Sequence, residues 1–199
     1  MQQRTPSPVR ERARRAMRAE LAMLAQDLFA EKGYEQTTIE DLVAAAGISK
    51  RTFFRYFTSK EDLVLGKHDV WAERLIDALN ARPGEEPLWE SFRRSFDVVV
   101  GFFNDQAQVT RTLAMEKIIQ GNPALSAGEI ERIARVQEQL ADFAGRRLKC
   151  DPATDPRPAA IAGAALACLI TAKNIWIATD RAEPFADLLD QAMAALTPA

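Results

Sequence analysis

The spacing of apolar residues constrains the fold of this chain most strongly. Apolar side chains recur three and four residues apart through most of its 199 residues, and no stretch alternates apolar and polar residues long enough to indicate a strand. The first such stripe consists of Leu21, Leu24, Ala25, Leu28 and Phe29. A glycine, Gly33, follows it as a helix stop. The sequence therefore predicts an all-α fold.

Caps and breaks divide this pattern into about nine helices. After the first helix, the expected segments are 38–46, 50–57, 60–81, 88–104, 106–120, 126–149, 159–181 and 184–196. Thr37 or Thr38 can cap the second helix, and Ser49 the third. Ser126 is the expected cap of the 126–149 helix. Three prolines within Asp151–Pro158 predict an extended joint before the next helix.

The composition narrows the classes of function. One histidine and two cysteines 18 positions apart cannot build a disulfide framework or a four-ligand zinc site, and they leave few routes to a hydrolytic triad. Nucleotide-binding, nucleophile-elbow and zinc-protease motifs are missing from the sequence. The basic N-terminus lacks the apolar core of a signal peptide, and the longest uncharged apolar stretch, 159–172, is short for a bilayer. We therefore expect a cytoplasmic protein that is not an enzyme, with no cofactor and no metal site.

The charges are unevenly distributed along the chain. The first 60 residues contain 11 Lys and Arg against 7 acids, a balance of +4, whereas the rest carries 15 against 21, a balance of −6. A basic module joined to an acidic body favours a polyanion as the partner of the module. Chance unevenness on solvated faces gives the same count, so the charge needs a motif to support it.

A helix-turn-helix motif supplies that support. Gly47 permits the positive φ of a turn between the second and third helices, and Ile48 follows it as a core residue. Phe53 and Phe57 lie four residues apart and must face inward. The residues predicted to face outward are Lys50, Arg51, Thr52, Phe54, Arg55 and Tyr56. Guanine-contacting donors, a hydroxyl and an aromatic edge for a thymine methyl suit a DNA major groove.

Four segments in uninterrupted order, Phe29–Tyr34, Thr37–Ile39, Ala45–Ser49 and Thr52–Leu63, resemble the N-terminal domain of TetR-family transcriptional regulators. The resemblance covers roughly residues 12–65 and is much more specific than a generic helix-turn-helix pattern. It implies a ligand-responsive regulator, usually a repressor, that binds a palindromic DNA operator as a homodimer. The implied domains are a flexible basic tail (1–11), a DNA-binding domain (12–59) and a ligand-binding and dimerisation domain (60–199).

The resemblance also assigns roles to individual residues. The positions that match Lys50, Arg51, Thr52 and Phe54 lie toward bases in the family, and those that match Thr38, Tyr56 and Lys60 bind phosphates. Tyr56 stands where many members have His and still offers a hydroxyl, whereas Phe54 stands where many have Tyr and offers only apolar contact. The plainer alternatives are that Phe54 belongs to the core and that Lys60 is simply solvated.

Small residues crowd the penultimate helix and predict a close helix–helix contact: Ala159, Ala160, Ala162, Gly163, Ala164, Ala165, Ala167 and Ala172. With the apolar last helix, this favours a homodimer held by four helices, although packing within one subunit explains the same pattern. A pocket for a small apolar or amphipathic effector is expected in the C-terminal domain, lined by Trp71, Trp89, Phe92, Phe96, Phe103, Met115 and Asn174. Most of these aromatic residues also fit an ordinary core.

Two other functions remain open from the sequence. A helical enzyme has little support because the residue inventory lacks a recognisable catalytic motif. An interaction protein that has lost DNA binding is less favoured because Lys50, Arg51, Thr52 and Lys60 are intact. Salt-dependent binding of DNA distinguishes both from a regulator.

Overall fold

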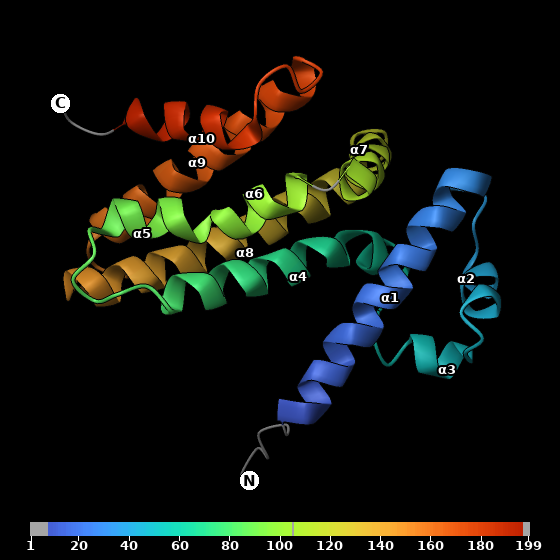
Figure 1. Cartoon of the computed structure of the whole chain (residues 1–199). Helices are drawn as coiled ribbons and strands as arrows, with labels where there is room; N and C mark the ends of the chain where they lie inside the picture. The colour runs from blue at the N-terminus through green and yellow to red at the C-terminus, as the bar shows by residue number, and fades with distance from the viewer. Residues whose placement is uncertain (1–7, 105, 197–199) are drawn as a thin grey trace, which may run out of the picture. The chain divides into compact units, whose positions relative to one another are not determined.

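The structure is a computed structural model that describes residues 8–104 and 106–196. These residues form helices and connecting turns without any strand, which confirms the all-α prediction (Figure 1). The helices are α1 (Pro8–Lys32), α2 (Ile39–Ala45), α3 (Lys50–Phe53), α4 (Lys60–Asn80), α5 (Leu88–Ser95), α6 (Asp97–Phe103), α7 (Gln106–Gln120), α8 (Pro123–Leu148), α9 (Pro156–Ala178) and α10 (Phe185–Ala194). The predicted helix 88–104 is divided at Phe96 into α5 and α6. Apart from this division, the helices of the described residues correspond to the nine expected helices. Of the tail predicted over 1–11, residues 1–7 lie outside the described residues, and α1 begins at Pro8.

Two compact units make up the chain. The first is the chain up to Val70 together with Thr110–Glu129, and the second is Trp71–Val109 together with the chain from Ile130 onward. The division between these two units falls inside α4. Thr110–Glu129, which comes from far along the chain, contributes to the first unit.

The core of the first unit draws on both of its segments. Side chains of α1, among them Leu21 and Phe29, are buried in one cluster with Phe53 and Phe57. The second segment adds three buried residues, Met115, Ile119 and Leu125. Each fully buried side chain of this size stabilises the fold by roughly 1.5–3 kcal/mol. The helix-turn-helix region is therefore packed partly on residues from α7 and α8.

The start of α8 differs from the prediction. The helix begins at Pro123 rather than at Ser126, because the Asn122 side chain accepts hydrogen bonds from the backbone N–H groups of Ala124 (3.0 Å) and Leu125 (3.2 Å). Pro123 has no N–H to satisfy and a φ already suited to the first turn. The Ser126 hydroxyl instead donates to the carbonyl of Ile119 (2.8 Å).

The joint before α9 is also shorter than expected. The Asp155 side chain accepts from the backbone N–H of Arg157 (2.9 Å), and α9 begins at Pro156 instead of Ala159. Prolines are excluded from helix interiors, but the first turn tolerates them because its N–H groups have no partner within the helix. Pro156 and Pro158 both lie in this first helical turn. The residues before Asp155 form a tight turn rather than the predicted extended joint, because the N–H groups of Thr154 (3.1 Å) and Asp155 (2.9 Å) both donate to the Asp151 carbonyl.

The second unit is organised around an aromatic cluster. The Phe103 ring lies 5.0 Å from the ring of Trp176 and 4.7 Å from that of Phe185, which joins α6, α9 and α10. By length and composition α9 is apolar enough to cross a membrane, but a single helix of this kind is weak evidence for a membrane span. Eight of its residues are buried inside the chain, and it packs along α10.

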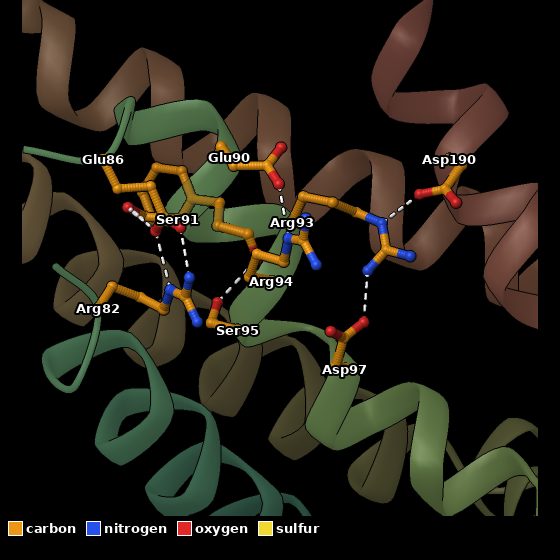
Figure 2. Close-up of polar contacts among 10 residues, drawn as sticks. Arg82, Glu86, Glu90, Ser91, Arg93, Arg94, Ser95, Asp97 and Asp190 are labelled. Carbon is orange, nitrogen blue, oxygen red and sulfur yellow. Dashed lines mark hydrogen bonds and ion pairs between the residues drawn. The ribbon is translucent and has the colours of Figure 1, made fainter.

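Ion pairs fix α5 within this unit. Figure 2 shows Arg93 between Asp97 (2.6 Å) and Asp190 of α10, and Arg82 paired with Glu86. Arg82 Nε and the Ser91 hydroxyl each donate to Glu86 Oε2 at 2.8 Å. These contacts lower the pKa of Glu86 to about 2, chiefly through the hydrogen bond from Arg82.

Candidate nucleic-acid interface

Two side-chain caps build the helix-turn-helix motif. Thr38, rather than Thr37, caps α2: its hydroxyl accepts from the Asp41 N–H (3.2 Å), and Asp41 Oδ2 accepts from the Thr38 N–H (2.9 Å). Ser49 caps α3 as predicted, by accepting from the Thr52 N–H (3.1 Å). Between the two helices Gly47 has a φ of +63°, a conformation that residues with a Cβ rarely adopt.

The recognition segment is shorter than the predicted helix 50–57. The helix α3 ends at Phe53, and residues 54–56 continue as tight turns in which the Arg55 N–H donates to Thr52 O (3.2 Å) and the Tyr56 N–H to Phe53 O (2.8 Å). The helix α4 begins at Lys60, so only a few residues connect these turns to it. Phe53 and Phe57 are both buried, as their spacing predicts.

Four of the predicted DNA-contacting residues gather on one surface. Arg51, Thr52, Phe54 and Arg55 line an open hollow of about 430 Å³. The Phe54 side chain is 52% exposed and meets Phe53 edge to face at 5.4 Å, so it is not a core residue. We call these four residues the reading face. It combines two guanidinium groups, a hydroxyl and an apolar ring, which are the groups that contact base edges in a major groove.

Lys50 lies beside the reading face but is engaged within the protein. Its ammonium group forms an ion pair with the Glu40 carboxylate of α2, and both side chains are more than half exposed. Arg55 Nη2 donates to the Tyr56 hydroxyl (3.1 Å), and its guanidinium lies 5.0 Å from the Tyr56 ring centre. Arg51 has no such polar contact with any described residue.

Lys60 lies at the start of α4, where phosphate contact is predicted, and has a structural role as well. Its Nζ donates to the backbone carbonyls of Tyr34 (2.8 Å) and Thr37 (3.1 Å) and lies 4.1 Å from the Tyr34 ring centre. Burial and the neighbouring Glu61 carboxylate raise the pKa of Tyr34, whose hydroxyl donates to Glu61 (3.2 Å). One ammonium proton of Lys60 remains for a further acceptor.

Thr38, another predicted phosphate ligand, is likewise committed to a neighbour. Its hydroxyl donates to Asp41 Oδ2 (2.8 Å), and Lys32 donates to Asp41 Oδ1 (2.9 Å). Hydrogen bonds from Thr38 and Lys32 hold the pKa of Asp41 well below its usual range. A phosphate at this helix N-terminus therefore has to compete with a carboxylate that already belongs to the chain.

Arg18 is the residue that sequence reasoning missed. The charge count of the first 60 residues does not distinguish it from the other arginines of α1, but its side chain is only 17% exposed. One guanidinium nitrogen donates to the Tyr56 carbonyl (3.1 Å) and another to Asp69 (3.1 Å), and the group lies 4.8 Å from the Phe57 ring centre. Arg18 thus fixes the recognition segment to α1 and α4. Arg18 lies four residues before Ala22, which packs against the core. This spacing places Arg18 near the apolar stripe of α1 and was the one signal available in the sequence.

The residues predicted to bind an effector do not all lie together. Met115 is buried in the core of the first unit, whereas the other six belong to the second unit. Phe92, Phe96 and Phe103 are buried, while Asn174 is exposed. The Trp89 indole N–H donates to the Met193 carbonyl (3.3 Å), which joins α5 to α10.

The small residues of α9 divide between two faces. Ala162, Ala165 and Ala172 are buried inside the chain. Ala160 and Ala167 are exposed and lie seven residues apart, on one side of the helix. The close-contact pattern thus reflects packing within the subunit in part, and the exposed face leaves room for a second contact.

Comparison with known proteins gives two family matches that cover most of the chain. Residues 24–66 match the sequence model described as "Bacterial regulatory proteins, tetR family", and residues 86–199 match the model described as "MftR C-terminal domain". The first match contains α2, the turn after it, and α3 with the following turns, which carry the reading face. The second covers most of the second unit together with α7 and the start of α8.

Two curated relatives and one solved structure illustrate these matches. The HTH-type transcriptional regulator TcmR of Streptomyces glaucescens is 33% identical over 155 residues, which cover 75% of this chain and 68% of that protein. The HTH-type transcriptional repressor KstR2 of Mycobacterium tuberculosis is 43% identical over 106 residues, which cover 46% of this chain and 51% of that protein. The crystal structure of a TetR-family regulator from Syntrophomonas wolfei is 20% identical, with a TM-score of 0.61 and 93% of each chain covered, and this likeness shows the fold alone.

Proposed function

Since the chain belongs to the TetR family of bacterial transcriptional regulators, we propose that it represses transcription by binding a palindromic DNA operator as a homodimer. The protein is a DNA-binding, ligand-responsive regulator, and the proposal concerns how this chain performs that role. The observation that supports it is the reading face, in which two guanidinium groups, a hydroxyl and an apolar ring lie together on a capped helix-turn-helix.

The proposed contacts follow from the chemistry of each side chain. Arg51 donates two hydrogen bonds to a guanine, and Phe54 contacts a thymine methyl group because it has no polar atom to offer. Thr52 supplies a hydroxyl to a base edge. Tyr56 and Lys60 bind phosphates, which position the motif without reading sequence.

The dimer contact is proposed on the exposed side of α9 and on α10. Ala160 and Ala167 let a second helix approach closely, and Ile175 and Leu196 add exposed apolar surface, 44% and 55% exposed. We expect Ala167→Glu to give monomers that bind a palindrome weakly. Ala165 is unsuitable for this test because it is fully buried, so that Glu would disrupt the subunit itself.

The effector is proposed to bind in the second unit, as a small apolar or amphipathic molecule. Aromatic side chains of α5 and α6 and at the start of the unit, including Trp71, Trp89 and Phe103, supply the apolar surface. Binding there changes DNA affinity by a coupling of about 1–3 kcal/mol. Since α4 belongs to both units, it provides a covalent route between them. The site of action is the cytoplasm, where the DNA lies.

The test is binding of the full chain to DNA from upstream of its own gene over a range of salt concentrations. We expect affinity to fall linearly on a log–log scale as salt rises, because phosphate contacts release counterions. Arg51→Ala should weaken binding and relax base preference, by about 1–3 kcal/mol, whereas Lys60→Ala should weaken all sequences about equally.

Arg135→Ala is the matched control, since it removes the same charge from an exposed position on α8. DNA binding that is independent of salt, or an Arg51→Ala variant that behaves like Arg135→Ala, would contradict the proposed interface. A base preference altered by Lys60→Ala and not by Arg51→Ala would show that the faces are wrongly assigned.

A further inference from the structure

The Glu40–Lys50 ion pair joins the two helices of the DNA-binding motif at the edge of the reading face. Glu40 lies in the first turn of α2, and Lys50 is the first residue of α3, next to Arg51. The two side chains are 63% and 55% exposed. The lysine nearest to the reading face is thus held by a carboxylate of its own chain.

This pairing has a direct consequence for DNA binding. A lysine contributes to affinity by neutralising a phosphate and releasing a counterion, irrespective of the base sequence. An ammonium group that is already paired has to leave its carboxylate first, and that carboxylate is in turn repelled by the DNA. An exposed pair of this kind is worth about 0.2–1 kcal/mol, which corresponds to a loss of about 1.4- to 5-fold in affinity per subunit.

From this geometry we propose that Glu40 lowers the affinity for DNA of any sequence by withholding Lys50 from the phosphates, while Arg51 and Phe54 read the bases. The proposal rests on the proposed DNA-binding function and concerns a residue that touches no base itself. Glu40 acts through Lys50 and is therefore a positioning residue.

The effect of such a carboxylate on operator binding is a change in affinity rather than in selectivity. A genome offers about 10⁶ or more non-specific sites, so occupancy of the operator depends on the ratio of specific to non-specific affinity. A free lysine would strengthen binding to every one of these sites through phosphate contact. An internal acid that weakens all sites equally at the phosphate lowers the absolute affinity and leaves this ratio to the base contacts.

The experiment measures binding of the full chain to two probes, the upstream fragment and a scrambled duplex of about 30 base pairs, between about 50 and 200 mM salt. We expect Glu40→Gln to bind both probes about 1.4- to 5-fold more tightly per subunit at the lower salt. The slope of log affinity against log salt should steepen by about 0.9 for the phosphate gained by each subunit. The ratio of specific to non-specific affinity should not rise.

Three further variants test the route through Lys50. Glu31→Gln makes the same change in net charge at an exposed position of α1 and should leave affinity near that of the unaltered protein. Lys50→Met should change affinity little, because the lysine is withheld already. In the Lys50→Met background, Glu40→Gln should have no further effect. Circular dichroism confirms that each variant is folded.

The outcomes separate this proposal from the proposed function. If the unaltered protein shows no salt-dependent binding to either probe, the DNA-binding function itself fails. If it binds but Glu40→Gln behaves as Glu31→Gln does, only the role of Glu40 is refuted. A Lys50→Met variant that loses as much affinity as Arg51→Ala would show that Lys50 already contacts the DNA, and a Glu40→Gln effect that persists without Lys50 would show that the carboxylate acts by another route.

Discussion

Replacing Arg18 by methionine tests whether one side chain of α1 supports the recognition segment. The substitution keeps an unbranched apolar stem of useful length but removes the guanidinium. Three contacts are lost at once: the hydrogen bond to the Tyr56 carbonyl, the ion pair with Asp69 and the stacking on Phe57. The guanidinium also covers Gly66 of α4, where an added Cβ would lie 3.3 Å from Arg18 Nη2.

The magnitude follows from these contacts. A hydrogen bond from a charged donor contributes about 1.5–3 kcal/mol to the free energy of unfolding. Stacking of a guanidinium on an aromatic ring adds about 0.5–2 kcal/mol according to burial. The pair with Asp69 adds less than about 1 kcal/mol, since Asp69 is 37% exposed. Because such terms are not additive, we expect a total loss of about 2–4 kcal/mol.

Urea unfolding followed by circular dichroism measures this loss at a fixed protein concentration. Arg15→Met, an exposed position on the same helix, should change stability by no more than about 0.5 kcal/mol. The stability of Arg18→Lys should be intermediate, because lysine keeps the charge but loses the planar guanidinium that donates to two acceptors. DNA affinity of Arg18→Met, measured well below its melting temperature, should also fall, since the Tyr56 carbonyl is no longer held. If Arg18→Met were as stable as Arg15→Met, the structural role of this side chain would be refuted.

Three other perturbations address the turn, the acid stability and the aromatic cluster. Gly47→Ala should cost about 1 kcal/mol in urea unfolding through its positive φ alone, because an added Cβ meets no atom within 4 Å. The paired Glu86 carboxylate should stabilise the fold above its usual pKa of 4.5, and this contribution should be lost as pH falls toward about 2, because the unfolded chain takes up the proton first. Glu86→Gln should remove this part of the pH dependence of the urea midpoint. An unchanged pH dependence would show that the pair with Arg82 contributes nothing to stability. Phe103→Ala should cost about 3–5 kcal/mol and shift the fluorescence of Trp176 to longer wavelength, and an unchanged spectrum would contradict the packing seen in the second unit.

The sequence predicted local features of the DNA-binding motif well, because their causes are local. The capping box of Thr38 and Asp41 and the cap at Ser49 depend on residues three positions apart, and the positive φ of Gly47 on the residue itself. The prediction that Ser126 caps α8 was wrong. Asn122 and Ser126 lie four residues apart and both have side chains that can cap a helix, so only the packing of the helix decides between them.

The sequence pattern did not predict packing between residues that are far apart in the chain. Met115 fits an apolar pocket wall and an apolar core equally well by periodicity, and its placement in the first unit depends on contacts with residues far away in the chain. Arg18 and its exposed basic neighbours are chemically alike, and only the fold turns one of them toward Phe57. The split between buried Ala165 and exposed Ala167 likewise follows from where α10 packs.

The positive charge of the first 60 residues illustrates the difference between a count and a binding surface. The excess of +4 correctly favours a polyanion, but Lys32 is paired with Asp41, Lys50 with Glu40, and Lys60 with two backbone carbonyls. Lys32 and Lys50 have to give up an internal partner before they gain a phosphate, so their contribution to affinity is a difference between two interactions, whereas Lys60 keeps one proton for a further acceptor. Arg51, without such a polar partner among the described residues, has no internal polar contact to break before it can bind DNA. Affinity should therefore respond more strongly to Arg51 than to Lys32 or Lys50, although all three count equally toward net charge.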